Sequence, residues 1–301
     1  MSGLAATRTI SPSVRKRSSW QRYLPGDIGR YIAALVCFVW ALFPIVFIIS
    51  AALNPAGTLS TAQLLPRQMS LSNFRDLFND PVRPYADWFR NSLVICLADS
   101  LITVFIGACS AYAFSRLRFK GRRAGLMGLL LIQLFPGTLA FLALYITFDQ
   151  IGNVIPVLGL NTTLGLVLAY TGGAMSANVW LLKGYLDTVP RELDQAARVD
   201  GASHARIFFT IITPLVMPIL VTVFMVSFIG FFSEFLLAGL FLQDVHRQTL
   251  AVGLNGMLKA DRNKYFGQFC AGALLASIPV VALYFGFQKQ LTGGLTQGSV
   301  K

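Results

Sequence analysis

Long apolar stretches recur along the chain and are separated by shorter polar segments. Each approaches the roughly 20 residues that an α-helix needs to cross about 30 Å of hydrocarbon. They cover residues 31–53, 91–114, 124–148, 163–186, 214–239 and 265–288. Within each stretch the apolar residues are continuous and do not alternate with polar ones, as they would in the strands of a membrane barrel. The pattern predicts an all-α, polytopic integral membrane protein with six transmembrane helices between residues 31 and 288.

Composition supports this class. Of the 301 residues, 55% are hydrophobic and 13% are charged, whereas roughly a quarter of the residues of a soluble domain are charged. The basic segment 1–30 followed by an apolar run could indicate a signal peptide. However, that run exceeds the ~7–15 residues of a signal-peptide core, and no convincing cleavage site closes it. We therefore expect an uncleaved first span.

The distribution of basic residues predicts the orientation. Segments 1–30, 115–123, 183–213 and 289–301 carry 17 of the 25 lysines and arginines. Both termini, as tails 1–30 and 289–301, are therefore expected in the cytoplasm, and the connection 241–264 is expected outside. The net charge of +12 is accounted for by this asymmetry and by anionic lipid headgroups, so it requires no nucleic-acid partner.

Motifs for catalysis or metal binding are absent from the sequence. The four cysteines fall inside predicted spans without CxxC spacing, and the only histidines are His204 and His246. There is no GxxxxGK[ST], HExxH or GxSxG pattern, so neither a nucleotide-binding loop nor a hydrolase site can be assembled. We expect a non-catalytic chain that binds no cofactor and takes any energy it uses from a partner.

Two kinds of residue inside the predicted spans are candidates for a transport path. Asp99 and Glu234 are the only acids there, and an acid at membrane depth usually faces a partner or a cavity. Several glycines and prolines interrupt the same spans, including Pro136-Gly137 and Gly230. Broken spans and buried acids also suit an ion-coupled secondary transporter, although we find no internal repeat of the kind such proteins contain.

The polar connection 187–213 is predicted to be a helix-turn-helix. Glu192 follows Pro190 and begins a short helix, in which Leu193, Ala196 and Ala197 would share one face. Asp194 and Arg198 are spaced to pair at i, i+4. Gly201 allows a sharp turn before a second helical stretch that leads to Pro214. Small residues on such a helix favour close docking of another protein.

Three segments outside the membrane are also predicted. Residues 71–78 form a short amphipathic helix, and Pro156 and Gly159 make a tight turn. The connection 241–264 is longer than a turn needs, and long loops are usually functional or disordered. Within it, Asn255, Gly256, Met257 and Leu258 would give a flexible loop with an apolar tip.

The connection 187–213 resembles the "EAA" loop of the permeases of ABC importers. The pattern Gln195-Ala-Ala, three residues, Gly201, nine residues and Ile211-Ile-Thr-Pro214 keeps the spacing of that motif. Gln195 stands where the family has glutamate, and Thr213 where it has leucine. Further stretches resemble the permeases that import sugars, in particular those of the maltose and maltodextrin type: Ala111–Phe119, Gln133–Pro136, Gly159–Thr162, Lys183–Tyr185, Thr249–Gly253 and Gly294–Lys301.

This resemblance implies a type I importer permease with the MetI-like fold, in the bacterial cytoplasmic (inner) membrane. It implies a second permease subunit, an ATPase homodimer that holds ATP-Mg, and an external sugar-binding protein. The segment 187–213, called the coupling segment below, would contact the ATPase through Glu192, Asp194, Gln195, Ala196, Ala197, Gly201 and Pro214. The C-terminal tail would touch the ATPases, and residues 255–258 the binding protein. The membrane sugar site would lie chiefly in the other permease. Trehalose or glycerol phosphate are alternative substrates.

Overall fold

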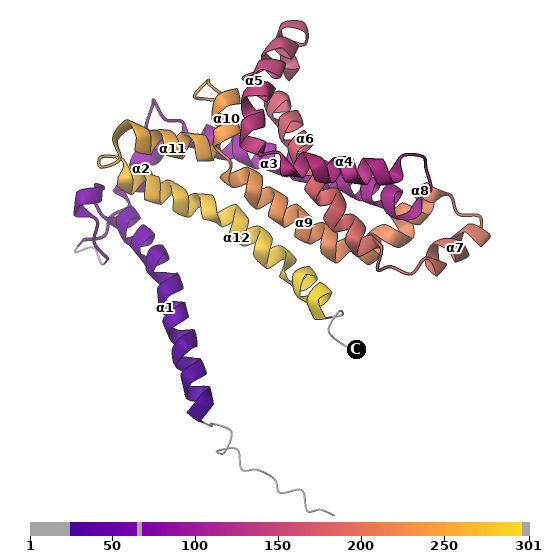
Figure 1. The fold of residues 1–301 in the computed structure, drawn as a ribbon. Helices are drawn as coiled ribbons and strands as arrows, with labels where there is room; N and C mark the ends of the chain where they lie inside the picture. The colour runs from indigo at the N-terminus through magenta and orange to yellow at the C-terminus, as the bar shows by residue number, and fades with distance from the viewer. Residues whose placement is uncertain (1–24, 65–67, 297–301) are drawn as a thin grey trace, which may run out of the picture. The chain divides into compact units, whose positions relative to one another are not determined.

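A computed structural model describes residues 25–64 and 68–296 (Figure 1). The chain divides after Phe47 into two units, and each is described by itself. The structure is helical, with these elements: α1 (Pro25–Leu53), η2 (Leu59–Thr61), α2 (Ser72–Asn79), α3 (Tyr85–Arg116), α4 (Arg122–Leu134), α5 (Gly137–Val154), η3 (Pro156–Leu158), α6 (Thr163–Leu186), α7 (Glu192–Val199), α8 (His204–Arg206), η4 (Ile207–Ile212), α9 (Thr213–Ser233), α10 (Leu236–Phe241), α11 (Leu250–Asp261) and α12 (Phe266–Thr296).

The predicted all-α membrane fold is confirmed. Among the described residues, five helices are long and apolar enough to cross a membrane, and a bent pair makes up to six. The fourth predicted span, 163–186, coincides with α6. The second begins six residues earlier than its apolar run, because α3 starts at Tyr85. Eight of the 13 residues of the predicted C-terminal tail, up to Thr296, continue α12, whereas residues 1–24 and 297–301 lie outside the described part.

The third predicted span is not one continuous helix. It is divided into α4 and α5, whose axes are bent by 98°. The break falls at Phe135 and Pro136, both of which have extended backbone. Proline lacks an N–H and disfavours helical backbone in the residue before it, so α4 ends there. The Pro136-Gly137 interruption therefore marks a break in the span.

The fifth predicted span also ends early. Helix α9 stops at Ser233, and a separate short helix, α10, begins at Leu236. The apolar run continues to residue 239, so hydropathy alone could not place this boundary. The residue at the break is Glu234, whose extended backbone ends α9.

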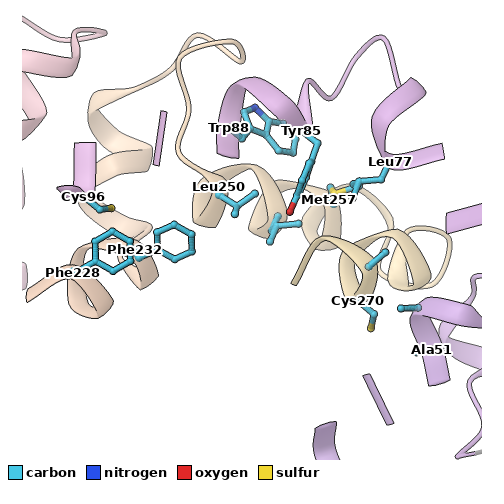
Figure 2. Close-up of a cluster of buried hydrophobic side chains, with 13 residues drawn as sticks. Ala51, Leu77, Tyr85, Trp88, Cys96, Phe228, Phe232, Leu250, Met257 and Cys270 are labelled. Carbon is cyan, nitrogen blue, oxygen red and sulfur yellow. The ribbon is translucent and has the colours of Figure 1, made fainter. Parts of the chain in front are cut away.

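Helices α3, α6 and α9 pack against one another and form the centre of the second unit (Figure 1). A cluster of buried side chains joins α3 to α2, α11 and α12 (Figure 2). Two hydrogen bonds fix it: the Tyr85 hydroxyl donates to the Gly272 carbonyl at 2.8 Å, and the Trp88 indole donates to the Val245 carbonyl at 2.7 Å. Figure 1 shows α2 and α11 at one end of this unit and α7 at the other.

The short helix and the tight turn predicted outside the spans are both confirmed. The segment 71–78 forms α2, in which Leu77 is fully buried while Leu71 and Phe78 are exposed. Helix α2 packs on α12, so protein covers Leu77 but not the whole apolar side of the helix. Pro156 begins the short turn η3, and Gly159 follows it.

The connection 241–264 is not the flexible loop that its length indicated. Residues 250–261 form helix α11. Met257 is 1% exposed and packs in the cluster of Figure 2, so it does not form an apolar tip. Gly256 lies inside the helix. The apolar spacing of Leu250, Leu254 and Met257 is the helical signal that the length argument overlooked.

Two glycines of α11 provide a matched stability test. A Cβ at Gly253 would overlap the indole ring of Trp88, whereas a Cβ at Gly256 meets nothing within 4 Å. Gly253→Ala is therefore expected to lower the melting temperature of the detergent-solubilised protein. Gly256→Ala should leave it unchanged or raise it, because alanine stabilises a helix interior by about 0.5–1 kcal/mol over glycine. Equal melting temperatures for the two variants would contradict the packing of Trp88 on α11.

Candidate functional site: the coupling segment and the membrane interior

The coupling segment begins where α6 ends. Helix α7 has the two acids Glu192 and Asp194 in its first turn and Arg198 in its last, which complements the helix dipole. It ends in a Schellman motif: the N–H of Ala202 donates to the carbonyl of Ala197 and the N–H of Gly201 to that of Arg198. Gly201 has a φ of +81°, a conformation that favours glycine. The predicted turn at Gly201 is confirmed.

The second half of the segment runs without interruption into a span. Helix α8 continues through the π-helical turn η4 into α9, where Pro214 lies in the first turn. Proline lacks an N–H, and its ring would crowd the carbonyl four residues earlier, which accounts for the wider turn before it. Thr213 donates a side-chain hydrogen bond to the Phe208 carbonyl at 2.8 Å across this turn. Helices α8 and α9 are therefore joined by continuous helical backbone.

The face of α7 predicted to be exposed for docking is confirmed at Ala196 and wrong at Ala197. The buried residues are Asp194 and Ala197, while Leu193 and Ala196 are exposed. The predicted pair between Asp194 and Arg198 is also wrong, because the Asp194 carboxylate binds Arg116. Asp194 can lie on the buried side of α7 because the guanidinium of Arg116, from the end of α3, neutralises its charge. The exposed face, with Glu192, Gln195 and Ala196, remains available to a partner.

Arg116, the last residue of α3, holds α7 in place. Its Nε lies 2.8 Å from Oδ2 of Asp194, and the two side chains are 2% and 6% exposed. Its Nη2 also donates to the Val189 carbonyl at 2.7 Å. The Arg116 side chain thus binds both Val189, which precedes α7, and Asp194 in its first turn. These contacts attach the coupling segment to the end of α3.

A second set of bonds joins α3 to the end of α6. The Ser115 hydroxyl donates to Asp187 at 2.6 Å, and Lys183 binds the other oxygen of that carboxylate at 2.6 Å. Arg191 donates to the Ser115 carbonyl at 3.3 Å. Burial alone would raise the pKa of the Asp187 carboxyl, but the bonds from Lys183 and Ser115 outweigh burial and lower the pKa below its usual value.

Sequence reasoning used Arg116 only as one charge in the topology count. Nothing in its local pattern indicates that it reaches 78 positions along the chain to Asp194. The one available indication is Asp194 itself, because a carboxylate on the buried side of a helix requires a cation nearby.

Asp99 lies inside α3 and is 0% exposed. Its Oδ1 accepts a hydrogen bond from the Thr171 hydroxyl at 2.6 Å and a longer one of 3.5 Å from Thr103. The other carboxylate oxygen is buried and lacks a hydrogen-bond partner in the described structure. Asp99 therefore joins α3 to α6 in the centre of the unit.

Glu234 occupies the break between α9 and α10. Its carboxylate accepts hydrogen bonds from the N–H groups of Leu237 and Ala238, at 2.8 and 3.0 Å, and from the Tyr170 hydroxyl at 2.5 Å. It thus satisfies the free N–H groups at the start of α10, as a capping acid does. The adjacent residues Tyr170 and Thr171 of α6 each bind one of the two acids.

A pocket of about 700 Å³ opens beside Glu234, between the bent pair α4–α5 and helices α6, α9 and α10. Aromatic side chains and a few polar groups line it, among them Phe135, Phe141, Tyr170, Phe231, Gln133 and Ser176. Asp99 does not line it. Of the two acids predicted for a path, only Glu234 therefore borders this pocket.

Part of α11 borders a neighbouring pocket of about 610 Å³, which shares Phe141 with the pocket beside Glu234. Asn255, Gly256 and Lys259 line it together with residues of α5 and α10. Met257 is buried on the other side of the helix. Of residues 255–258, which were predicted to form an exposed surface, Gly256 is the most exposed and Met257 is buried.

The comparison with known families agrees with this architecture. Residues 103–296 match the family model described as "Binding-protein-dependent transport system inner membrane component". The chain belongs to this family and is a multi-pass inner-membrane permease component.

Among its relatives is the maltose/maltodextrin transport system permease protein MalG of Yersinia pestis, 38% identical over 89% of this chain and 91% of the relative. MalG of Escherichia coli K12 is 36% identical over 89% and 93% of the two chains. A crystal structure of a bacterial ABC transporter that imports alginate has a chain 20% identical, with a TM-score of 0.74, covering 91% of this chain and 98% of that one. The MetNI methionine ABC transporter gives 17% identity and a TM-score of 0.51, covering 67% and 92%. These structures share the fold.

Proposed function

We propose that this chain is one of two membrane subunits of an ABC importer for maltose and maltodextrin-type oligosaccharides. The similarity to MalG permeases over nine tenths of the chain carries this proposal. The aromatic pocket beside Glu234 suits a sugar path, because apolar sugar faces pack on aromatic rings while a few polar groups bind hydroxyls. No arginine or lysine borders that pocket, which disfavours glycerol phosphate as substrate.

The chain itself hydrolyses no ATP in this proposal. An ATPase homodimer, which holds ATP-Mg, docks on the exposed face of α7 formed by Glu192, Gln195 and Ala196, and a second permease completes the path. Asp194, Ala197, Gly201 and Pro214 maintain the shape of the coupling segment. The Arg116 link and the continuous path from α8 to α9 then carry ATPase motion to α3 and α9.

The substrate assignment is tested by uptake of labelled sugars in cells that contain the complete transporter. We expect maltose and maltotriose to be taken up, and unlabelled maltodextrin to compete. Uptake of trehalose or glycerol phosphate with no maltose uptake would overturn the substrate and leave the permease assignment intact.

The external sugar-binding protein is proposed to contact α11 around Asn255, Gly256 and Leu258. Gly256→Trp places a large side chain on the exposed side of the helix, where nothing lies within 4 Å of a new Cβ. We expect normal assembly but at least a tenfold weaker stimulation of ATP hydrolysis by the sugar-loaded binding protein. Gly256→Ala is the control and should behave as wild type. If the binding protein stimulated ATP hydrolysis fully in the tryptophan variant, α11 would not be part of the interface with the binding protein.

The orientation, with both termini cytoplasmic, is proposed from the basic residues of the connections. Reporter fusions after Arg123 and within the turn at Asn263 should therefore report opposite sides of the membrane. Finding both reporters on one side would contradict the six-span topology.

A further inference from the structure

A third pocket lies on the side that the charge distribution predicts to be cytoplasmic. It has a volume of about 630 Å³ and opens between the end of α3 and the coupling segment. Four arginines line it together with His204: Arg116, Arg118, Arg191 and Arg198. Asp194 is the only acid of the lining. The pocket is therefore strongly cationic.

The charges of this pocket are not balanced by the protein. Asp194 forms its ion pair with Arg116. Arg191 donates to a neutral carbonyl, that of Ser115, and Arg198 lies 3.5 Å from the Nδ1 of His204. Positive charges gathered in one concave surface attract and concentrate anions.

Arg116 supplies a second, independent indication of a ligand. Its side chain is 2% exposed, and its Nη1 is buried without a hydrogen-bond partner in the described structure, as are its Nε, which makes only the ion pair with Asp194, and Oδ1 of Asp194. An unsatisfied buried donor of a charged group is costly. An anion seated in the pocket against the Arg116 guanidinium would satisfy it after a small adjustment of the lining.

We propose that this pocket binds a phosphate group, either of an anionic phospholipid headgroup or of free phosphate. Arginines bind phosphate oxygens with paired N–H groups, which favours phosphate where several guanidinium groups converge. The position at the end of a span, with Leu117 and Phe119 beside the arginines, suits a headgroup whose acyl chains remain in the membrane. Basic pockets at the cytoplasmic ends of membrane helices bind such headgroups.

The site would have a consequence for the coupling segment. Arg116 and Arg118 belong to the end of α3 and the residues after it, whereas Arg191 and Arg198 belong to the coupling segment. A phosphate bound between them draws the two elements together and adds to the Arg116–Asp194 link. This proposal does not depend on which sugar is transported.

Lipid binding is tested on the full-length chain, purified with the subunits that stay bound to it. Native mass spectrometry counts phosphatidylglycerol retained from mixed phosphatidylglycerol and phosphatidylcholine nanodiscs, and a parallel titration uses inorganic phosphate. Arg118→Gln/Arg198→Gln should weaken binding of the retained anion roughly tenfold for each arginine lost. Arg118→Lys/Arg198→Lys keeps the charge but loses the paired N–H groups of arginine. Its affinity for the anion should lie between those of the wild type and the glutamine variant.

The matched control is Arg122→Gln/Arg123→Gln, which removes the same charge from the neighbouring basic residues outside the pocket lining. It should bind as wild type. If phosphatidylglycerol stays bound when millimolar phosphate is added, the ligand is the lipid headgroup. If millimolar phosphate displaces it, the ligand is free phosphate. Equal loss in both glutamine variants would overturn the proposal. A cross-linked acidic segment of an associated ATPase in the pocket would overturn it too.

Discussion

Replacing Arg116 with methionine is expected to reduce sugar uptake at least tenfold. The change leaves the Asp194 carboxylate, which is 6% exposed, without its counter-charge. Removal of one partner from a buried ion pair typically costs about 3–5 kcal/mol. We expect α7 to leave its position on α3, which lowers the amount of folded protein and disconnects ATP hydrolysis from the membrane helices. Uptake and ATP hydrolysis of the purified transporter, normalised to protein, measure the effect.

Two further variants separate the ion pair from general damage. Arg116→Met/Asp194→Leu replaces the pair with apolar side chains, an exchange that is often neutral, and should restore the amount of folded protein and part of the uptake. Arg123→Met removes an exposed charge from the first turn of α4 and should transport normally. If Arg116→Met assembled and transported as wild type, α3 would not be joined to the coupling segment as described.

Gly201→Val is expected to uncouple hydrolysis from uptake. The φ of +81° at this position is strained for any L residue with a Cβ, by roughly 1–2 kcal/mol, and most for a β-branched one. Valine therefore opens the turn between α7 and α8 and misplaces both helices. We expect uptake to fall about tenfold while ATP hydrolysis continues, measured together in proteoliposomes.

Asparagine at Gly201 provides the matched control, because it adopts the left-handed conformation far more readily than valine. Nothing lies within 4 Å of a new Cβ at this position, so the Cβ of either variant fits and the backbone preference is the main difference between them. Gly201→Asn should retain most of the coupled uptake. Equal uptake by the two variants would show that the turn conformation is not what couples α7 to α8.

Hydropathy and turn residues predicted the parts of this fold that depend on local physics. Apolar runs located the spans, and the spacing from Ala196 to Gly201 located the turn. The length of the connection 241–264 was misread as flexibility, because the helical spacing of Leu250, Leu254 and Met257 was not weighed. The boundary at Ser233 was missed because the apolar run continues past the break.

Contacts between distant residues could not be read from the sequence. The inner face of α7 depends on Arg116, which folds against it from the end of α3. In the same way Glu234 looked like a free acid within a span, yet it caps α10 and binds Tyr170. Both cases show polar side chains whose role is determined by the tertiary partner that satisfies them.

The central claim is that uptake through this chain is driven by a separate ATPase that acts on the coupling segment. It is tested most directly in proteoliposomes containing this chain, its second permease and the ATPase, with the sugar-binding protein and labelled maltose on one side and ATP-Mg on the other. We predict maltose accumulation that requires ATP and the ATPase and is insensitive to ionophores. Accumulation without the ATPase, abolished by collapse of an ion gradient, would contradict the account and favour an ion-coupled transporter.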